Sequence, residues 1–186
     1  MKRAYLLALV ALVMVPPAAA QLITPKSRPP LTPEKLKIQS ALVMFRDSLS
    51  AVQGGASRLE RDLANSSDAV TRTRSREISE ACASSSRASN TLQQTVENSP
   101  DPIADPKKTR AGVVAALRDL RSALDQCHEE FTRLGNPERA EELRGYGVSR
   151  AARLNAPMNR YYLAVANYLG PLDMELPVGT VSPPAH

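Results

Sequence analysis

The stretch IQSALVMFRDSLSAVQGGASRLERDL, Ile38–Leu63, decides the fold predicted for this chain. Its apolar residues follow spacings of four and three without a miss: Ile38, Leu42, Phe45, Leu49, Val52, Ala56, Leu59 and Leu63. That spacing places one stripe, called here the seam, along a helix that packs against neighbours, as in coiled coils and four-helix bundles. Gly54 and Gly55 lie inside this first helix and are the point where we expect it to bend.

Two later segments repeat the spacing. The seam of the third helix consists of Val113, Leu117, Leu120, Leu124, Cys127, Phe131 and Leu134. The seam of the fourth helix consists of Leu154, Met158, Tyr161, Val165 and Tyr168. Pro157 lies inside this fourth helix and predicts a kink near Arg153 to Ala156, because proline removes a backbone donor and clashes with the preceding turn.

The second helix, about Ser67 to Asn98, has a seam of small and partly polar residues. These are Ile78, Cys82, Ser85, Ser89, Leu92 and Val96. Small residues allow close approach of two helices but bury little apolar area. We therefore expect this helix to be the least stable of the four and to need another support.

Helix starts divide the chain into four. Thr32-Pro33-Glu34 combines a capping residue, a proline in the first helical position and an acidic residue near the positive end of the dipole. Asp105-Pro106 and Asn136-Pro137-Glu138 repeat the pattern, and Ser66-Ser67-Asp68 is a weaker start. The short connections predict an all-α, up-down-up-down antiparallel four-helix bundle. The rival is an elongated antiparallel coiled coil that buries its seams by oligomerising.

The N-terminus has the pattern of a secretory signal peptide. Lys2 and Arg3 precede an apolar run, Tyr5–Val15, that is too short to span a bilayer, and small residues follow it. With cleavage after Ala20, the predicted organisation is a signal peptide over 1–20, a proline-rich linker over 21–31, a helical domain over 32–170 and a proline-rich tail over 171–186. No later segment is apolar enough for a membrane helix, so we expect a protein exported to the periplasm or the outside of the cell.

Charge and composition argue against nucleic-acid binding. Without Lys2 and Arg3, the 24 Lys and Arg residues fall to 22, against 19 Asp and Glu residues. This excess is small for a nucleic-acid binder. Aromatic residues make up 4% of the chain and Trp is absent, so platforms for stacking bases or sugars are scarce.

The two cysteines, Cys82 and Cys127, both fall on seams. The second and third helices are consecutive, and an antiparallel turn near Asp101 places the two cysteines within about one helical turn, roughly 6 Å, of the same level. In an exported protein this arrangement predicts a disulfide, which would also hold the weakly apolar second helix. The alternative is a pair of free buried thiols.

His128 follows Cys127, which raises the question of haem or metal. Covalent haem attachment needs C-x-x-C-H, and Leu124 occupies the first position of that motif. Non-covalent haem would need inward axial ligands, for which His128 with Met158 is the candidate pair. His128 is one position off its seam, beside Glu129 and Glu130, which favours a solvated or ion-paired side chain. We therefore expect no cofactor and no metal site.

The densest basic run is TRTRSRE, Thr71–Glu77. Arg72 and Arg76 share one helix face and Arg74 lies on another, so the run could meet an anionic envelope polymer or an acidic partner. The simpler interpretation is a solvated face paired with Glu77 and Glu80.

Nothing in the sequence indicates an enzyme. No G-x-S-x-G motif occurs, and serines on long helices favour packing or solvation over nucleophilic catalysis. The sequence predicts a non-catalytic bundle that acts by binding or scaffolding, with an unknown protein or envelope polymer as partner and possible homo-oligomers. Two alternatives stay open: a haem-binding electron-transfer bundle, and an oligomeric coiled-coil envelope protein with holdase-like activity.

Overall fold

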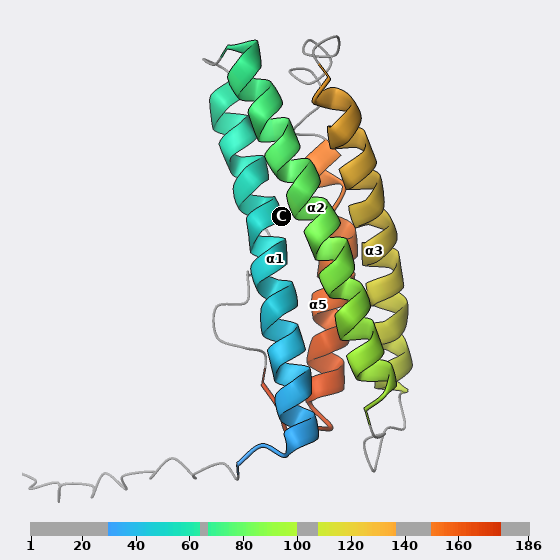
Figure 1. Ribbon diagram of the computed structural model, residues 1–186. Coiled ribbons are helices and arrows are strands. Elements are labelled where there is room, and N and C mark those ends of the chain that lie inside the picture. Colours follow the sequence, from blue (N-terminus) through green and yellow to red (C-terminus); the bar gives the residue numbers. More distant parts are fainter. Residues whose placement is uncertain (1–29, 64–66, 100–107, 137–149, 176–186) are drawn as a thin grey trace, which may run out of the picture. The chain divides into compact units, whose positions relative to one another are not determined.

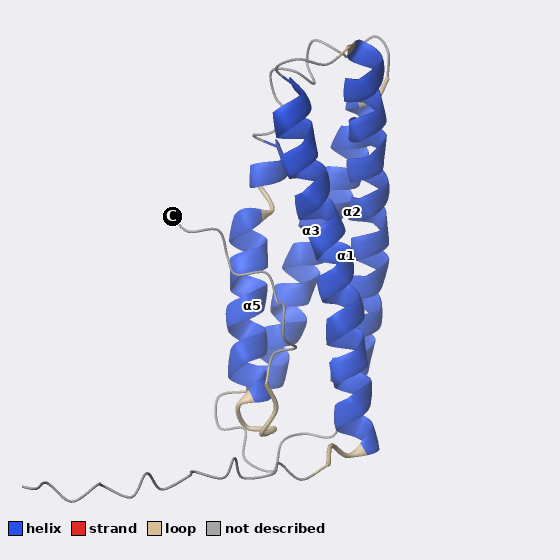
Figure 2. Cartoon of the chain, turned by 90° about the vertical axis from the view of Figure 1, so that its left-hand side faces the viewer, coloured by secondary structure: helices blue, strands red, loops and turns tan. Residues whose placement is uncertain are grey.

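The computed structural model describes residues 30–63, 67–99, 108–136 and 150–175. The predicted signal peptide, nearly all of the linker and the tail after Glu175 lie outside the described residues. The chain separates into two units, Met1–Pro30 and Leu31–His186, and every helix described here belongs to the second. These helices are α1 (Pro33–Leu63), α2 (Asp68–Glu97), α3 (Thr109–Leu134) and α5 (Asn155–Leu169) (Figure 1). The described residues contain no strand (Figure 2).

The first two helices begin where the sequence predicts. Pro33 is the first residue of α1, and the backbone N–H of Lys35 donates to Thr32 Oγ1 across 3.4 Å. Ser67 is the capping residue of α2, and the N–H of Asn98 closes that helix by donating to Gln94 O.

The predicted start of the third helix is wrong by a few residues. Asp105-Pro106 lies outside the described residues, and α3 begins at Thr109. The residue before it, Lys108, has φ 49° in the left-handed region, which is incompatible with continuing a right-handed helix back toward Pro106.

The irregularity predicted near Pro157 is confirmed, and it is a break rather than a kink. Residues 150–152 are helical, Arg153 and Leu154 form a turn, and α5 starts at Asn155. Pro157 is therefore in the first turn of α5, where a missing backbone N–H costs little. The predicted start at Asn136-Pro137-Glu138 lies almost wholly outside the described residues.

The helices pack in sequence, with contacts between α1 and α2, α2 and α3, and α3 and α5. Across each contact, residue numbers rise along one helix while those of their partners fall along the other. The pairs are Arg74–Asp62 and Glu77–Arg58 between α2 and α1, and Ser75–Phe131 and Ser89–Leu117 between α2 and α3. At the α5–α3 contact they are Arg153–Glu130, just before α5, and Arg160–Asp119. Each pair of neighbours is thus antiparallel. Because the connection from α3 to α5 is outside the described residues, the complete up-down-up-down path stays a prediction.

The predicted seams form the core. Every seam residue of the second, third and fourth predicted helices is buried. On α1 the seam residues from Ile38 to Leu59 are buried except Ala56, which is half-buried while its neighbour Gly55 is fully buried. Between α1 and α5 the core is aromatic: the rings of Phe45 and Tyr161 meet edge to face with centroids 5.0 Å apart. Burial raises the pKa of the Tyr161 hydroxyl.

The chain after α5 turns back onto the bundle. The N–H of Met174 donates to Leu169 O, and the Met174 side chain joins the buried core. Lys35 Nζ of α1 donates to Leu172 O. The first residues of the predicted tail therefore pack against the start of α1. None of the described helices has both the length and the apolar character that a membrane span requires.

Candidate binding surfaces

The predicted disulfide joins Cys82 of α2 to Cys127 of α3, with Cα atoms 6.0 Å apart. It lies within a row of side-chain hydrogen bonds from α2 to α3. Ser75 Oγ donates to Phe131 O at 2.7 Å, and Ser86 Oγ donates to Asp125 Oδ1 at 2.5 Å. The contact between α2 and α3 is therefore supported by a covalent bond and by buried serine hydroxyls of α2 that donate to α3.

His128 belongs to this α2–α3 contact. Its Nδ1 lies 2.9 Å from Ser79 Oγ and 3.1 Å from Ser79 O, and Ser79 Oγ is also 2.6 Å from Thr132 Oγ1. The expectation that His128 is solvated or ion-paired with its glutamate neighbours is corrected: the imidazole is half-buried and hydrogen-bonded to α2.

Met158, the other haem-ligand candidate, is buried on α5. It belongs to the apolar core, whereas His128 belongs to the polar α2–α3 contact. Their assignment as axial ligands stays a prediction. Within the described residues, no three His, Cys, Asp or Glu side chains are grouped so that they would hold a metal ion.

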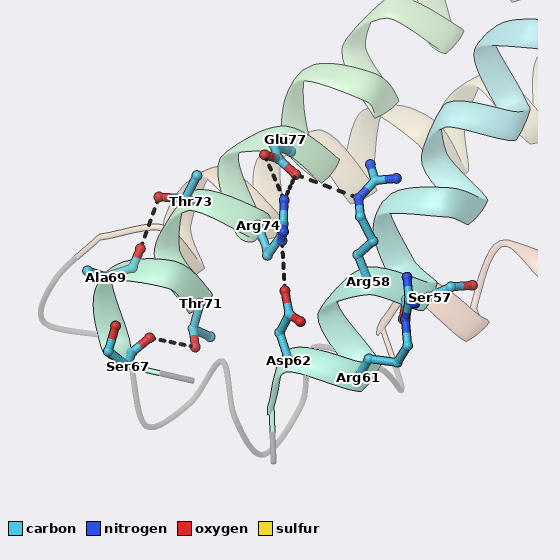
Figure 3. Close-up of polar contacts among 10 residues, drawn as sticks. All are labelled: Ser57, Arg58, Arg61, Asp62, Ser67, Ala69, Thr71, Thr73, Arg74 and Glu77. Carbon is cyan, nitrogen blue, oxygen red and sulfur yellow. Dashed lines mark hydrogen bonds and ion pairs between the residues drawn. The ribbon is translucent and has the colours of Figure 1, made fainter. Parts of the chain in front are cut away.

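Of the three arginines in the run Thr71–Glu77, Arg74 is paired with carboxylates of α1 and α2 (Figure 3). Its Nε lies 2.8 Å from Asp62 Oδ2 of α1, and its Nη1 lies 2.9 Å from Glu77 Oε2. The hydrogen bonds to Asp62 and Glu77 raise the pKa of the guanidinium. Glu77 also faces Arg58 of α1 at 3.9 Å. Arg74 therefore joins α2 to α1. Its ion pair with Glu77 agrees with the simpler interpretation, in which the arginines of this run pair with glutamates of their own helix.

Arg72 and Arg76 lie on the other face. Arg72 is half-buried and Arg76 is exposed. The stem of Arg76 passes close to Gly135 at the end of α3, since a Cβ at Gly135 would be 3.5 Å from Arg76 Cγ. This places Arg76 where the helix dipole of α3 is negative, which favours a structural role. Binding of an anion or acidic partner by Arg72 and Arg76 stays a prediction.

A groove between α1 and α2 is the surface that sequence reasoning missed. It has a volume of about 550 Å³ and lies between the first three turns of α1 and the last three turns of α2. Its lining residues are Glu34, Leu36, Lys37, Ser40, Ala41 and Met44 of α1 with Ala88, Thr91, Thr95, Asn98 and Ser99 at the end of α2. Leu36 and Met44 are 49% and 64% exposed, although both are large and apolar.

The hydroxyl groups on the α2 wall of the groove bond to the backbone of their own segment. Thr91 Oγ1 donates to Arg87 O, Thr95 Oγ1 to Thr91 O and Ser99 Oγ to Thr95 O, at 3.3, 2.9 and 2.6 Å. These hydroxyls are thus used within α2. The signal for this groove was present in the sequence, because Leu36 and Met44 are apolar residues outside the seam, eight residues apart on one helix face.

Comparison with known proteins gave no relative: no family model, no curated protein and no solved structure matches this chain.

Proposed function

We propose that this chain is an exported, non-catalytic bundle that acts by binding or scaffolding in the periplasm or extracellular space, through the α1–α2 groove. In this proposal the chain follows the predicted up-down-up-down path. The observation that carries it is the pair Leu36 and Met44, left in water at the edge of a groove of about 550 Å³. Exposed apolar side chains beside a concave apolar surface are stabilised when a partner covers them.

Other features support the same interpretation. A buried disulfide fits an oxidising compartment, and it fixes α2, which forms one wall of the groove. Methionine suits a binding edge, because its flexible, polarisable side chain adapts to differently shaped partners. The charged side chains that line the groove, Glu34 and Lys37, both belong to the first turns of α1 and fit the polar rim of an interface.

The groove is tested by titrating the protein, at the lowest concentration that gives a signal, with a neutral apolar dye, N-phenyl-1-naphthylamine. The wild-type chain should increase the dye fluorescence, and Met44→Glu should abolish most of the increase by placing a charge at the groove edge. The matched control is Val70→Glu, because Val70 is 40% exposed in the first turn of α2, at the opposite end of that helix from the groove. An equal signal from wild type and Met44→Glu would remove the groove from the proposal.

Export is tested separately by the intact mass of the chain recovered from the cell envelope or medium. Removal of the leader after Ala20 gives a mass that begins at Gln21, and a chain that still begins at Met1 would contradict cleavage at this site.

A further inference from the structure

Two neighbouring side chains of α5 have buried polar atoms that lack a hydrogen-bond partner. They are Asn159 and Tyr162, and no residue that the structure describes bonds to Asn159 Oδ1 or to the Tyr162 hydroxyl. The Tyr162 side chain is buried, with the residue only 9% exposed. The two residues are three positions apart, so their side chains lie on one face of α5. A buried polar atom without a partner costs free energy, so this face is incomplete within the described part of the chain.

This face of α5 lies beside α1. Burial raises the pKa of the Tyr162 hydroxyl, against an opposing effect of the Arg46 charge, so the hydroxyl is close enough to α1 to interact with that charge. The ring of the preceding residue, Tyr161, meets Phe45 of α1 edge to face, and the Tyr161 and Tyr162 ring centroids are 5.2 Å apart. Tyr162 and, one turn before it, Asn159 therefore lie beside an aromatic contact between α5 and α1.

The group that completes this face must both donate and accept hydrogen bonds. An amide oxygen only accepts, so Asn159 Oδ1 needs a donor, whereas the hydroxyl proton of Tyr162 needs an acceptor. The two residues differ in height along α5 by about 4.5 Å. An extended peptide offers backbone N–H and C=O groups about every 3 Å and leaves them free, whereas a helix uses its own. Proline-rich peptides in this conformation also pack well on aromatic side chains.

The chain has a segment of this kind, and it begins next to this face. Residues 176–186, LPVGTVSPPAH, are rich in proline and follow a turn that reverses the chain. Asp173 in that turn has φ 52° in the left-handed region, and the N–H of Met174 donates to Leu169 O. These are the features of a Schellman motif, which ends a helix and redirects the chain. Lys35 of α1 donates to the same turn, so the turn lies between α5 and the start of α1.

We propose that residues 176–186, which lie outside the described residues, form an extended strap that runs back along α5 and packs on Asn159 and Tyr162 beside α1. Backbone N–H and C=O groups of the strap pair with Asn159 Oδ1 and the Tyr162 hydroxyl. Asn159 lies about 15 Å from the C-terminal end of α5 along its axis. The segment spans about 34 Å when extended, so it reaches both side chains. This inference goes beyond the proposed function, because it concerns a different face from the α1–α2 groove.

The strap is tested by thiol labelling of the full chain with its disulfide intact. With three residues per turn, Val178 and Val181 share one face of the strap, and Thr180 and Ser182 lie on the others. The apolar pair faces the bundle. Val178→Cys and Val181→Cys should therefore react with iodoacetamide about tenfold more slowly than Thr180→Cys and Ser182→Cys, and all four at equal rates in urea. Four equal rates in the folded protein would overturn the proposal.

The place of the strap is tested in the Val181→Cys chain. Adding Tyr162→Phe or Asn159→Ala removes one partner of the strap, so the thiol should react faster while the circular dichroism spectrum stays unchanged. Ser85→Ala is the matched control, since it removes a buried hydroxyl of α2 and should leave the labelling rate as it was. If neither change on α5 alters the rate, the segment is protected elsewhere and the proposal is wrong. A rate that rises on dilution would also overturn it, because the segment would then be bound by a second copy.

Discussion

Helix α2 meets its two neighbours through different kinds of surface. Toward α3 it carries Cys82 and buried serines, which contact α3 by a disulfide and by hydroxyl groups. Toward α1 it packs Ile78 closely against Gly55, and Arg74 forms an ion-pair cluster. Further along the same contact, α1 and α2 leave the groove edged by Leu36 and Met44.

The difference shows that the small residues of α2 have different effects on its two faces. Serine is small enough to let α2 and α3 approach closely, and its hydroxyl can donate to a neighbouring helix when water is excluded. Among the described residues, no serine hydroxyl of the α2 seam bonds to α1, so this contact depends more on the fit of side chains. Where the facing residues are small on α2 and no larger side chain fills the space, as at Ala88, the contact opens.

The largest expected effect comes from removing the covalent part of the α2–α3 contact. The disulfide links residues 45 apart in sequence, and the loop-entropy estimate for closing such a loop is about 4 kcal/mol. Reduction should therefore lower the free energy of unfolding by about 2–4 kcal/mol, measured by urea unfolding followed by circular dichroism with and without a phosphine reductant.

The double variant Cys82→Ala with Cys127→Ala is the control, since its unfolding should not respond to reductant. If the urea midpoint of the wild type is also the same with and without reductant, then the hydroxyl contacts alone hold α2 against α3. The disulfide would then not contribute to the difference between the two faces of α2.

The sequence predicted the α2–α3 contact better than the α1–α2 contact, for a physical reason. Helical spacing identifies which residues face inward, and it selected Cys82 and Cys127 correctly because a seam position is a property of one helix. The groove depends on how two helices meet: Gly55 lies close to Ile78, whereas Met44 and Ala88 stand on opposite walls of the groove. Pairings between helices are not contained in the periodicity of either one. His128 was misjudged for the same reason, because its partner Ser79 lies on another helix.

A smaller effect is expected from the apolar end of the α1–α2 contact. A Cβ at Gly55 would lie 2.9 Å from Ile78 Cγ1, which is closer than two carbon atoms pack, so the helices must move apart or Ile78 must shift. Gly55→Ala should lower the free energy of unfolding by about 1–2 kcal/mol, less than overpacking alone would cost, because alanine also gains helix propensity. Urea unfolding of the oxidised chain measures this.

The neighbouring Gly54→Ala is its matched control. There the added Cβ meets only the mobile end of the Arg58 side chain, at 3.3 Å, so the helix propensity of alanine should dominate and stabilise the protein by about 0.5–1 kcal/mol. If both variants stabilise the chain equally, the close approach at Gly55 is not required, and the α1–α2 contact is looser than described.

The smallest effect separates hydrogen bonding from packing on the α3 face of α2. Ser75 and Ser85 are both fully buried on α2, but Ser75 Oγ donates to Phe131 O at 2.7 Å whereas Ser85 Oγ has no partner among the described residues. Ser75→Ala should destabilise the chain by about 1 kcal/mol, and Ser85→Ala should be neutral or slightly stabilising, because a buried hydroxyl without a partner costs free energy. Both changes gain the same helix propensity, so the difference between their urea midpoints isolates the bond to Phe131 O. Equal effects would mean that the serines of α2 contribute through their size alone, and the two faces of α2 would then differ only by the disulfide.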